Sequence, residues 1–178
     1  MYQQKQAVFR IKNETTIIFN EKGRRKKMGT AIDRNSFIQI NIIVKDIDAA
    51  AEKWAQIFGI EKPEIREMNL EGGENYTYRG EPVSCKLLVA IIPMNGFVLE
   101  LHQPIDGPST FQEFLDKHGN GIHHIGFEVG DDRDAVIDNL ACMGFDTNRT
   151  LGIYPGSSWT IVDTEDVLGV NLNIKPVR

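Results

Sequence analysis

The sequence contains little cysteine and no long apolar run. Cys85 and Cys142 are its only cysteines, and their spacing fits neither a metal site nor a redox motif. No apolar stretch approaches the ~20 residues that span a bilayer, and the first residues lack the apolar core of a secretory signal. We therefore expect a protein of the reducing cytoplasm that has no membrane partner.

Positive charge is scarce over most of the chain, and no Gly-rich loop of the phosphate-binding type is present. Residues 1–27 carry a net charge of +6, so the remaining residues carry −11. An acidic body is a poor surface for nucleic acid, because phosphate contacts need clustered positive charge. These absences argue against a nucleic-acid partner and against a nucleotide cofactor. The basic run at residues 23–27 is interpreted as part of a solvated tail.

Residues 1–35 are predicted to be an N-terminal extension, with two interpretations left open. Purine-rich codons for residues 23–27 would form a bacterial ribosome-binding site before Met28, which would make residues 1–27 a translated leader. Alternatively, the alternation in residues 8–12 and 15–19 predicts a hairpin that turns near Asn13. Non-purine codons at 23–27 in the genomic DNA would exclude the leader.

The rest of the chain contains an internal repeat. A strand at residues 38–44 precedes a helix that Asp46 or Asp48 can cap and that ends at Gly59. The same order returns with a strand at residues 123–129 and a helix that ends at Gly144. Three further strands are predicted after each helix, at residues 74–80, 85–93 and 96–104 in the first copy and 148–154, 157–163 and 169–176 in the second.

The repeat predicts an α+β fold made of two βαβββ modules. Module one covers residues 36–104 and module two covers residues 120–176, within one domain at 36–178. A linker helix at residues 108–119 joins them, and it begins with a capping box formed by Ser109 and Gln112.

Strand alternation separates a polar face from an apolar face in both modules. On the first strand, for example, Gln39 and Asn41 oppose four aliphatic residues. His123 falls on the aliphatic side of its strand and is interpreted as structural. The polar face of the four phased strands comprises Gln39, Asn41, Glu100, His102, His124, Glu128, Asn171 and Asn173.

Two similar modules related by a pseudo-twofold axis can pair their sheets into one concave surface. Gln39 would then mirror His124, and Glu100 would mirror Asn173. The pattern therefore predicts that these four side chains converge on one site. Trp159 lies on a strand and either lines an apolar pocket wall or takes part in ordinary packing.

Together with the linker helix, four segments give the chain a resemblance to a known family that runs from about Ser36 to Pro176: residues 40–60 (INIIVKDIDAAAEKWAQIFGI), 97–104 (FVLELHQP), 121–129 (GIHHIGFEV) and 163–174 (DTEDVLGVNLNI). The chain resembles the vicinal oxygen chelate superfamily, which contains glyoxalases, bleomycin-resistance proteins and dioxygenases. Within it, the methylmalonyl-CoA epimerase and glyoxalase I branch is the most similar. The resemblance implies a concave mixed sheet, a homodimer, and one divalent metal ion held by Gln39, Glu100, His124 and Asn173. Zinc, nickel, cobalt, manganese and magnesium are not distinguished.

The chain departs from that branch at two positions. Asn173 stands where the family usually has a glutamate that moves the substrate proton, and an amide cannot act as a base near neutral pH. Counting back from Glu100 puts Leu88 where a second carboxylate is expected, with Lys86 as the alternative if the register differs.

The predicted function is that of a metal-dependent lyase or isomerase of the lactoylglutathione lyase or methylmalonyl-CoA epimerase type. Glu100 and His102 are the candidate catalytic residues, and the metal stabilises the enolate of a small carbonyl substrate. Substrate-pocket positions are assigned to Asn41, Glu128, Asn171 and Trp159.

Two other functions stay open. A metal-independent binding protein of the bleomycin-resistance type is favoured by Asn173 and by the missing second carboxylate. An iron dioxygenase needs two histidines and a carboxylate around the metal, whereas the predicted ligand set contains only one histidine.

Overall fold

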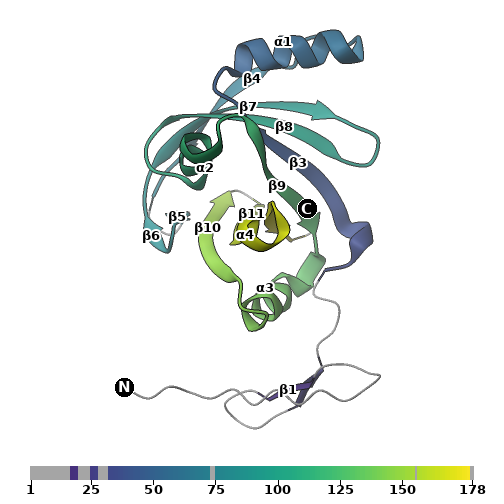
Figure 1. Ribbon diagram of the computed structural model, residues 1–178, viewed down its shortest axis with the longest axis vertical. Helices are drawn as coiled ribbons and strands as arrows, with labels where there is room; N and C mark the ends of the chain where they lie inside the picture. The colour runs from purple at the N-terminus through teal and green to yellow at the C-terminus, as the bar shows by residue number, and fades with distance from the viewer. Residues whose placement is uncertain (1–16, 20–24, 28–31, 73–74, 155, 177–178) are drawn as a thin grey trace. The chain divides into compact units, whose positions relative to one another are not determined.

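The computed structural model describes residues 17–19, 25–27, 32–72, 75–154 and 156–176 (Figure 1). The chain divides into two compact units, Met1–Ala31 and Ile32–Arg178. In the first unit, strand β1 (Ile17–Phe19) pairs antiparallel with strand β2 (Arg25–Lys27). The predicted partner strand at residues 8–12 lies outside the described residues, and the translated leader stays a prediction.

The second unit is built on one curled, ten-stranded mixed sheet (Figure 1). Its order is β4-β7-β8-β3-β9-β12-β11-β10-β5-β6, with β3 and β9 antiparallel at the centre and each parallel to its outer neighbour. The predicted α+β class and the concave mixed sheet are confirmed. The strands are β3 (Phe37–Ile43), β4 (Ile65–Leu70), β5 (Tyr76–Tyr78), β6 (Glu81–Pro82), β7 (Cys85–Pro93), β8 (Val98–Asp106), β9 (Gly121–Glu128), β10 (Asp146–Tyr154), β11 (Ser157–Asp163) and β12 (Asn171–Lys175).

Helix α1 (Ile47–Phe58) covers the outer face of the sheet in the first half. It begins where the Asp46 carboxylate accepts a hydrogen bond from the Ala49 N–H at 3.0 Å, and it ends at Gly59, whose φ is 65°. Its buried residues Ile47 and Ala51 pack with Val44, Ala90 and Leu101. On the aliphatic side of the first strand, Val44 is buried in this cluster and Ile42 packs against it, whereas Ile38 and Ile40 are only partly buried.

Helix α2 (Thr110–His118) is the predicted linker helix, and it packs on the inner face of the sheet. The Ser109 hydroxyl accepts a hydrogen bond from the Gln112 N–H at 3.1 Å and caps the helix. Phe111 and Phe114 pack from this helix against a cluster formed by Ile43, Leu87 and Val89.

Four further helical segments are found in the described residues. They are α3 (Arg133–Cys142), α4 (Glu165–Leu168) and the 3-10 turns η1 (Arg34–Ser36) and η2 (Gly130–Asp132). Within the part of the chain that the structure describes, no helix has the length and apolarity to cross a bilayer.

The strand assignment of module one needs a correction. The predicted strand at residues 74–80 exists as β5, but it pairs with β10 and so extends the second half of the sheet. The second strand of module one is β4, which pairs with β7. Sequence alternation missed β4 because its four central residues, 66–69, are all exposed, which gives no apolar period to recognise.

The strand register confirms the predicted mirror relation between the modules. When β3 is superposed on β9 and β8 on β12, the cross-strand pairs are preserved. Gln39 then falls on His124, and Glu100 falls on Asn173. The pairs concerned are Gln39 with Gly126, Asn41 with His124, Asn41 with Glu100, and Gly126 with Asn173.

A bulge interrupts the alternation of β9. Asn41 lies opposite His124 but Ile42 lies opposite Ile122, so His123 is the extra residue. Ile122 is half exposed, whereas the His123 ring is fully buried, with its centroid 5.1 Å from that of Phe111. The placement of His123 on the aliphatic face was therefore wrong, because both histidines point inward.

Candidate functional site

A cavity of about 500 Å³ lies on the inner side of the sheet. One wall is apolar and includes Leu87, Val89, Ile91, Phe111 and Trp159. Such a volume suits a small organic ligand. Six polar residues of the lining lie on the central strands, namely Gln39, Glu100, His102, His124, Asn173 and Lys175, whereas Asn69, Glu71 and Asn75 line the cavity from elsewhere.

The four mirrored residues are in direct contact at one end of this cavity. The Gln39 amide donates to the Glu100 carboxylate, and its Nε2 lies 3.2 Å from His124 Nε2. The Asn173 Nδ2 lies 3.2 Å from the same imidazole nitrogen. Both halves of the sheet therefore contribute to one contiguous polar cluster centred on His124 Nε2.

Donors for a metal ion are present in this cluster, although its charge is low. Two buried amide oxygens, Gln39 Oε1 and Asn173 Oδ1, have no hydrogen-bond partner among the described residues. Rotation of each amide would turn its oxygen toward the centre, beside His124 Nε2 and the Glu100 carboxylate. Oxygen and imidazole donors of this kind suit a divalent ion. The described residues contain no group of three or more His, Cys, Asp and Glu side chains able to hold a metal, so the two amides are needed for the fit.

The tautomer of His124 is set by His123. Their Nδ1 atoms lie 2.8 Å apart, and His123 Nε2 lies 3.1 Å from Thr110 Oγ1. Burial lowers the pKa of His123 to about 3 and the pKa of His124 well below its ordinary value, so both rings are neutral. Because two amide groups face His124 Nε2, the consistent assignment puts its proton on Nδ1, donated to His123. The Nε2 lone pair then faces the cavity side.

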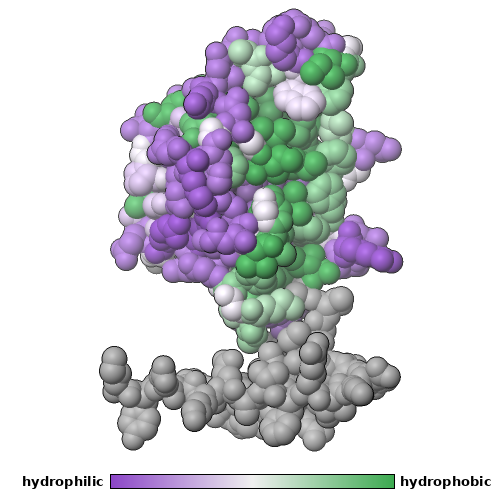
Figure 2. All heavy atoms as spheres, viewed as in Figure 1, coloured by the Kyte–Doolittle hydropathy of each residue, from purple (hydrophilic) through white to green (hydrophobic). Residues whose placement is uncertain are grey.

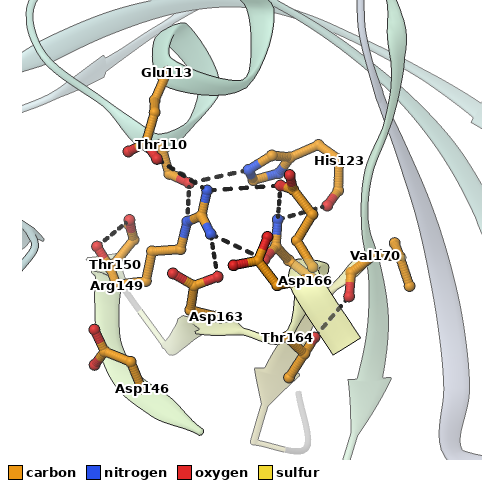
Figure 3. A network of polar contacts seen from close by, with 12 residues as sticks. Thr110, Glu113, His123, Asp146, Arg149, Thr150, Asp163, Thr164, Asp166 and Val170 are labelled. Atoms are coloured by element: carbon orange, nitrogen blue, oxygen red, sulfur yellow. Dashed lines mark hydrogen bonds and ion pairs between the residues drawn. The ribbon is translucent and has the colours of Figure 1, made fainter. Parts of the chain in front are cut away.

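A buried arginine supports this histidine pair from the other side (Figure 3). Arg149 is 4% exposed, and its Nε donates to Thr110 Oγ1 at 2.8 Å. Its guanidinium also donates to the carboxylate of Asp163 and to Asn171 Oδ1 at 3.2 Å. Glu113 at 3.4 Å and Glu165 at 3.8 Å complete its anionic surroundings. The network therefore ties α2, β10, β11, β12 and α4 together behind His123.

Glu100 and His102 form a second pair of polar side chains, on β8. Both are buried, and His102 Nε2 lies 3.3 Å from Glu100 Oε2. A proton taken up by the Glu100 carboxylate can pass to the imidazole over this distance. His102 therefore adds a group able to accept a proton next to Glu100, which is one of the four mirrored residues.

The family of the chain follows from its sequence over most of this domain. The model of the glyoxalase/bleomycin resistance protein/dioxygenase superfamily matches residues 38–161, which cover nearly all of module one and most of module two. The chain belongs to this superfamily. No curated protein matches it.

Two solved structures share the superfamily fold. One is a hypothetical protein, BH1468, from Bacillus halodurans C-125, with 18% identity, a TM-score of 0.55, and coverage of 80% of this chain and 94% of the other. The second is a methylmalonyl-CoA epimerase from Mycobacterium tuberculosis, with 22% identity, a TM-score of 0.51, and coverage of 85% and 93%. At these identities, the likeness concerns the fold alone.

Three of the predicted pocket residues do not line the cavity of this superfamily member. Asn171 is bound into the arginine network and donates to the His123 carbonyl at 3.1 Å. Asn41 is completely buried between the strands that carry Glu100 and His124. Glu128, at the end of β9, is also not part of the lining. Residues can thus share a strand face with the site and still lie outside its cavity.

The predicted register of the third strand was also wrong. Ile91 lies opposite Glu100, so the residues of β7 that face the cavity are Leu87, Val89 and Ile91. Leu88 packs with the outer cluster instead. The conclusion that this strand supplies no carboxylate is unchanged.

Among the lining residues, Lys175 was missed by sequence reasoning and Trp159 was left undecided. Lys175 lies on β12 two residues beyond Asn173, so one more step of the same alternation would have found it. Trp159 was left undecided between pocket wall and ordinary packing, and it lines the cavity. It lies over Gly152, where an added Cβ would stand 2.1 Å from the indole ring.

We expect Gly126→Ala to damage the site by displacing Gln39. An added Cβ would stand 2.8 Å from the Gln39 Cβ, a contact that neither strand can relieve easily. Overpacking of this kind costs about 1–3 kcal/mol of unfolding free energy, which urea denaturation would measure. Gly121→Ala on the same strand is the control, because its Cβ would meet only the Phe114 ring, at 3.3 Å. Equal losses in both variants would contradict the specific role of Gly126.

Proposed function

We propose that this protein is a metal-dependent lyase or isomerase that removes a proton beside the carbonyl group of a small substrate. The observation that carries the proposal is the convergence of Gln39 and Glu100 with His124 and Asn173 at one end of an apolar cavity. The fold shared with a methylmalonyl-CoA epimerase agrees with this reaction class.

The chain's own residues divide the task between binding and proton transfer. Gln39, Glu100, His124 and Asn173 would hold a divalent ion. When bound, such an ion supplies Lewis-acid stabilisation of negative charge on the substrate oxygen. The Glu100–His102 pair accepts the proton, and the charge that develops on His102 is stabilised by the adjacent carboxylate. The apolar wall excludes water from the reacting carbon.

Deuterium exchange in heavy water tests the reaction on a panel of small ketones, aldehydes and thioesters. We expect the protein to catalyse exchange of the hydrogen next to the carbonyl group in one member of the panel, as followed by NMR. Chelation should abolish the exchange. His102→Gln should slow it by about 10²–10⁴-fold, the usual contribution of a positioned general base.

The control for that variant is His118→Gln, because His118 is an exposed residue of α2 that bonds Glu165 outside the cavity lining. Exchange that persists unchanged under chelation would contradict the role of the metal. Exchange that persists in His102→Gln would contradict the assigned base.

A metal-independent binding protein is the second candidate. The observation that favours it is that the four side chains already hydrogen-bond one another through the amides of Gln39 and Asn173. Ligand affinity that is indifferent to chelators, together with no exchange on any carbonyl compound, would support this candidate.

We also infer a cytoplasmic homodimer. The free thiol of exposed Cys142 suits a reducing compartment. On the face shown in Figure 2, apolar side chains gather over β8, β3 and β9, whereas polar ones gather over α2 and β10. A second copy would bury such a surface, and sedimentation equilibrium would measure the oligomeric state.

A further inference from the structure

Lys175 is a buried cation in the cavity wall that has no anion of its own among the described residues. It is 7% exposed and lies on β12, on the same face as Asn173. Within that part of the chain, its ammonium group forms no ion pair or hydrogen bond. Because Lys175 lines the cavity, an anionic ligand bound there is positioned to pair with its ammonium group.

The nearby acidic residues do not supply that partner. Glu100 lies within the cavity, but its carboxylate accepts from Gln39 and contacts His102. Glu128 is the cross-strand neighbour of Lys175, but it does not line the cavity, and no ion pair joins these two described residues. Glu71 lies at the exposed end of the lining. The anion for Lys175 is therefore expected on the ligand.

The pseudo-twofold relation defines where this cation stands in the site. The exchange that carries Glu100 onto Asn173 also carries His102 onto Lys175, because each lies two residues further along its strand. The cavity thus has a proton-accepting pair on the module-one side and a cation at the matching position of module two. The apolar residues Val89 and Trp159 lower the polarity between them, which strengthens an ion pair with a ligand.

We infer that the ligand of this cavity is a small carboxylic acid and that Lys175 binds its carboxylate. This inference rests on the proposed function, in which the substrate is a carbonyl compound. The substrate class is then a carbonyl compound that carries a carboxylate a few bonds from its reacting carbon. Lys175 then fixes one end of the substrate while the Glu100–His102 pair faces the other. It is a specificity residue, because a neutral ester or amide of the same shape leaves the cation unpaired.

Matched pairs of acids and esters test the inference. The probes are 2-oxobutanoate with its methyl ester, succinate with its dimethyl ester, and inorganic phosphate, each titrated calorimetrically at millimolar concentration with EDTA present. We expect at least one acid to bind and its ester to bind at least about tenfold more weakly. Lys175→Met should lose the difference between acid and ester, whereas Lys175→Arg should keep it.

The outcomes separate this inference from the proposed reaction, because EDTA removes any metal contribution. An acid that binds in EDTA through Lys175, with no deuterium exchange on any substrate, would support the inference while contradicting the proposed function. Any one of four results would overturn the inference: equal binding of acid and ester, unchanged acid binding in a folded Lys175→Met protein, binding of no acid, or binding of phosphate alone. The comparison of acid with ester in the unaltered protein requires no variant to fold.

Discussion

Arg149→Leu is expected to lower the free energy of unfolding by about 3–5 kcal/mol, the usual cost of removing one partner from a buried ion network. The guanidinium neutralises Asp163, Glu113 and Glu165 and is itself 4% exposed (Figure 3). Leucine fills part of the volume but takes the Arg149 cation from Asp163, whereas Glu113 keeps Arg79 and Glu165 keeps Lys117. Urea denaturation followed by circular dichroism would measure the loss.

The matched control for Arg149 is an arginine in an exposed ion pair. Arg66 contacts Glu64 at 2.5 Å, but both side chains are more than two-thirds exposed. We expect Arg66→Leu to change stability by no more than about 0.5 kcal/mol. A loss in Arg149→Leu no larger than the loss in Arg66→Leu would contradict a structural role for the network.

Acidification should destabilise the metal-free protein well above the pH at which carboxylates titrate. Burial, assisted by the charge of Arg149, lowers the pKa of His123 to about 3, and burial also lowers the pKa of His124 well below 6.5. Below pH 6.5 the unfolded chain therefore takes up two protons that the folded state excludes, so stability is full above pH 6.5 and falls as the pH drops. Two such histidines together account for a loss of roughly 4 kcal/mol between pH 7.5 and pH 5.

Glu165 extends the same trend to lower pH. Burial would raise its pKa, but hydrogen bonds from Lys117 and His118 outweigh burial and lower the pKa to about 2. The stabilisation that Glu165 contributes is present above pH 4.5 and is lost as the pH falls toward 2.

The variant His123→Gln tests the histidine contribution. It should remove roughly half of the loss of stability between pH 7.5 and pH 5, as measured by urea denaturation at each pH. A stability that is flat over this interval would show that the histidines are not held neutral.

Local signals in the sequence predicted the parts of the fold that depend on neighbouring residues. The Asp46 cap, the Gly59 stop, the Ser109 cap and the polar face of β3 and β12 all follow from spacing within a single element. The repeat then predicted which polar residues meet across the pseudo-twofold axis. The caps, the strand faces and the internal repeat can all be recognised from the order of residues along the chain.

The errors arise where tertiary packing overrides local alternation. A bulge at His123 adds a residue without changing the composition of the strand, so the inward turn of both histidines carries no sequence signal. The offset between β7 and β8 depends on the geometry of the connection at residues 94–97. Counting back from Glu100 therefore placed Leu88 on the cavity face, whereas Leu87 and Val89 lie on it. The crossing of β5 to the far side of the sheet depends on contacts with β10 that no local pattern contains.

The central claim is that the mirrored positions Gln39, Glu100, His124 and Asn173 form one site for a divalent ion. Manganese titration followed by electron paramagnetic resonance, on the unaltered protein and on Asn173→Glu, tests it most directly. Adding a carboxylate at the mirror position of Glu100 should tighten binding on the order of tenfold or more, because ligand charge sets affinity for hard cations. Val167→Glu, which adds the same charge at a residue that is 74% exposed, should leave the affinity unchanged. Equal affinity in the unaltered protein and in Asn173→Glu would contradict the claim.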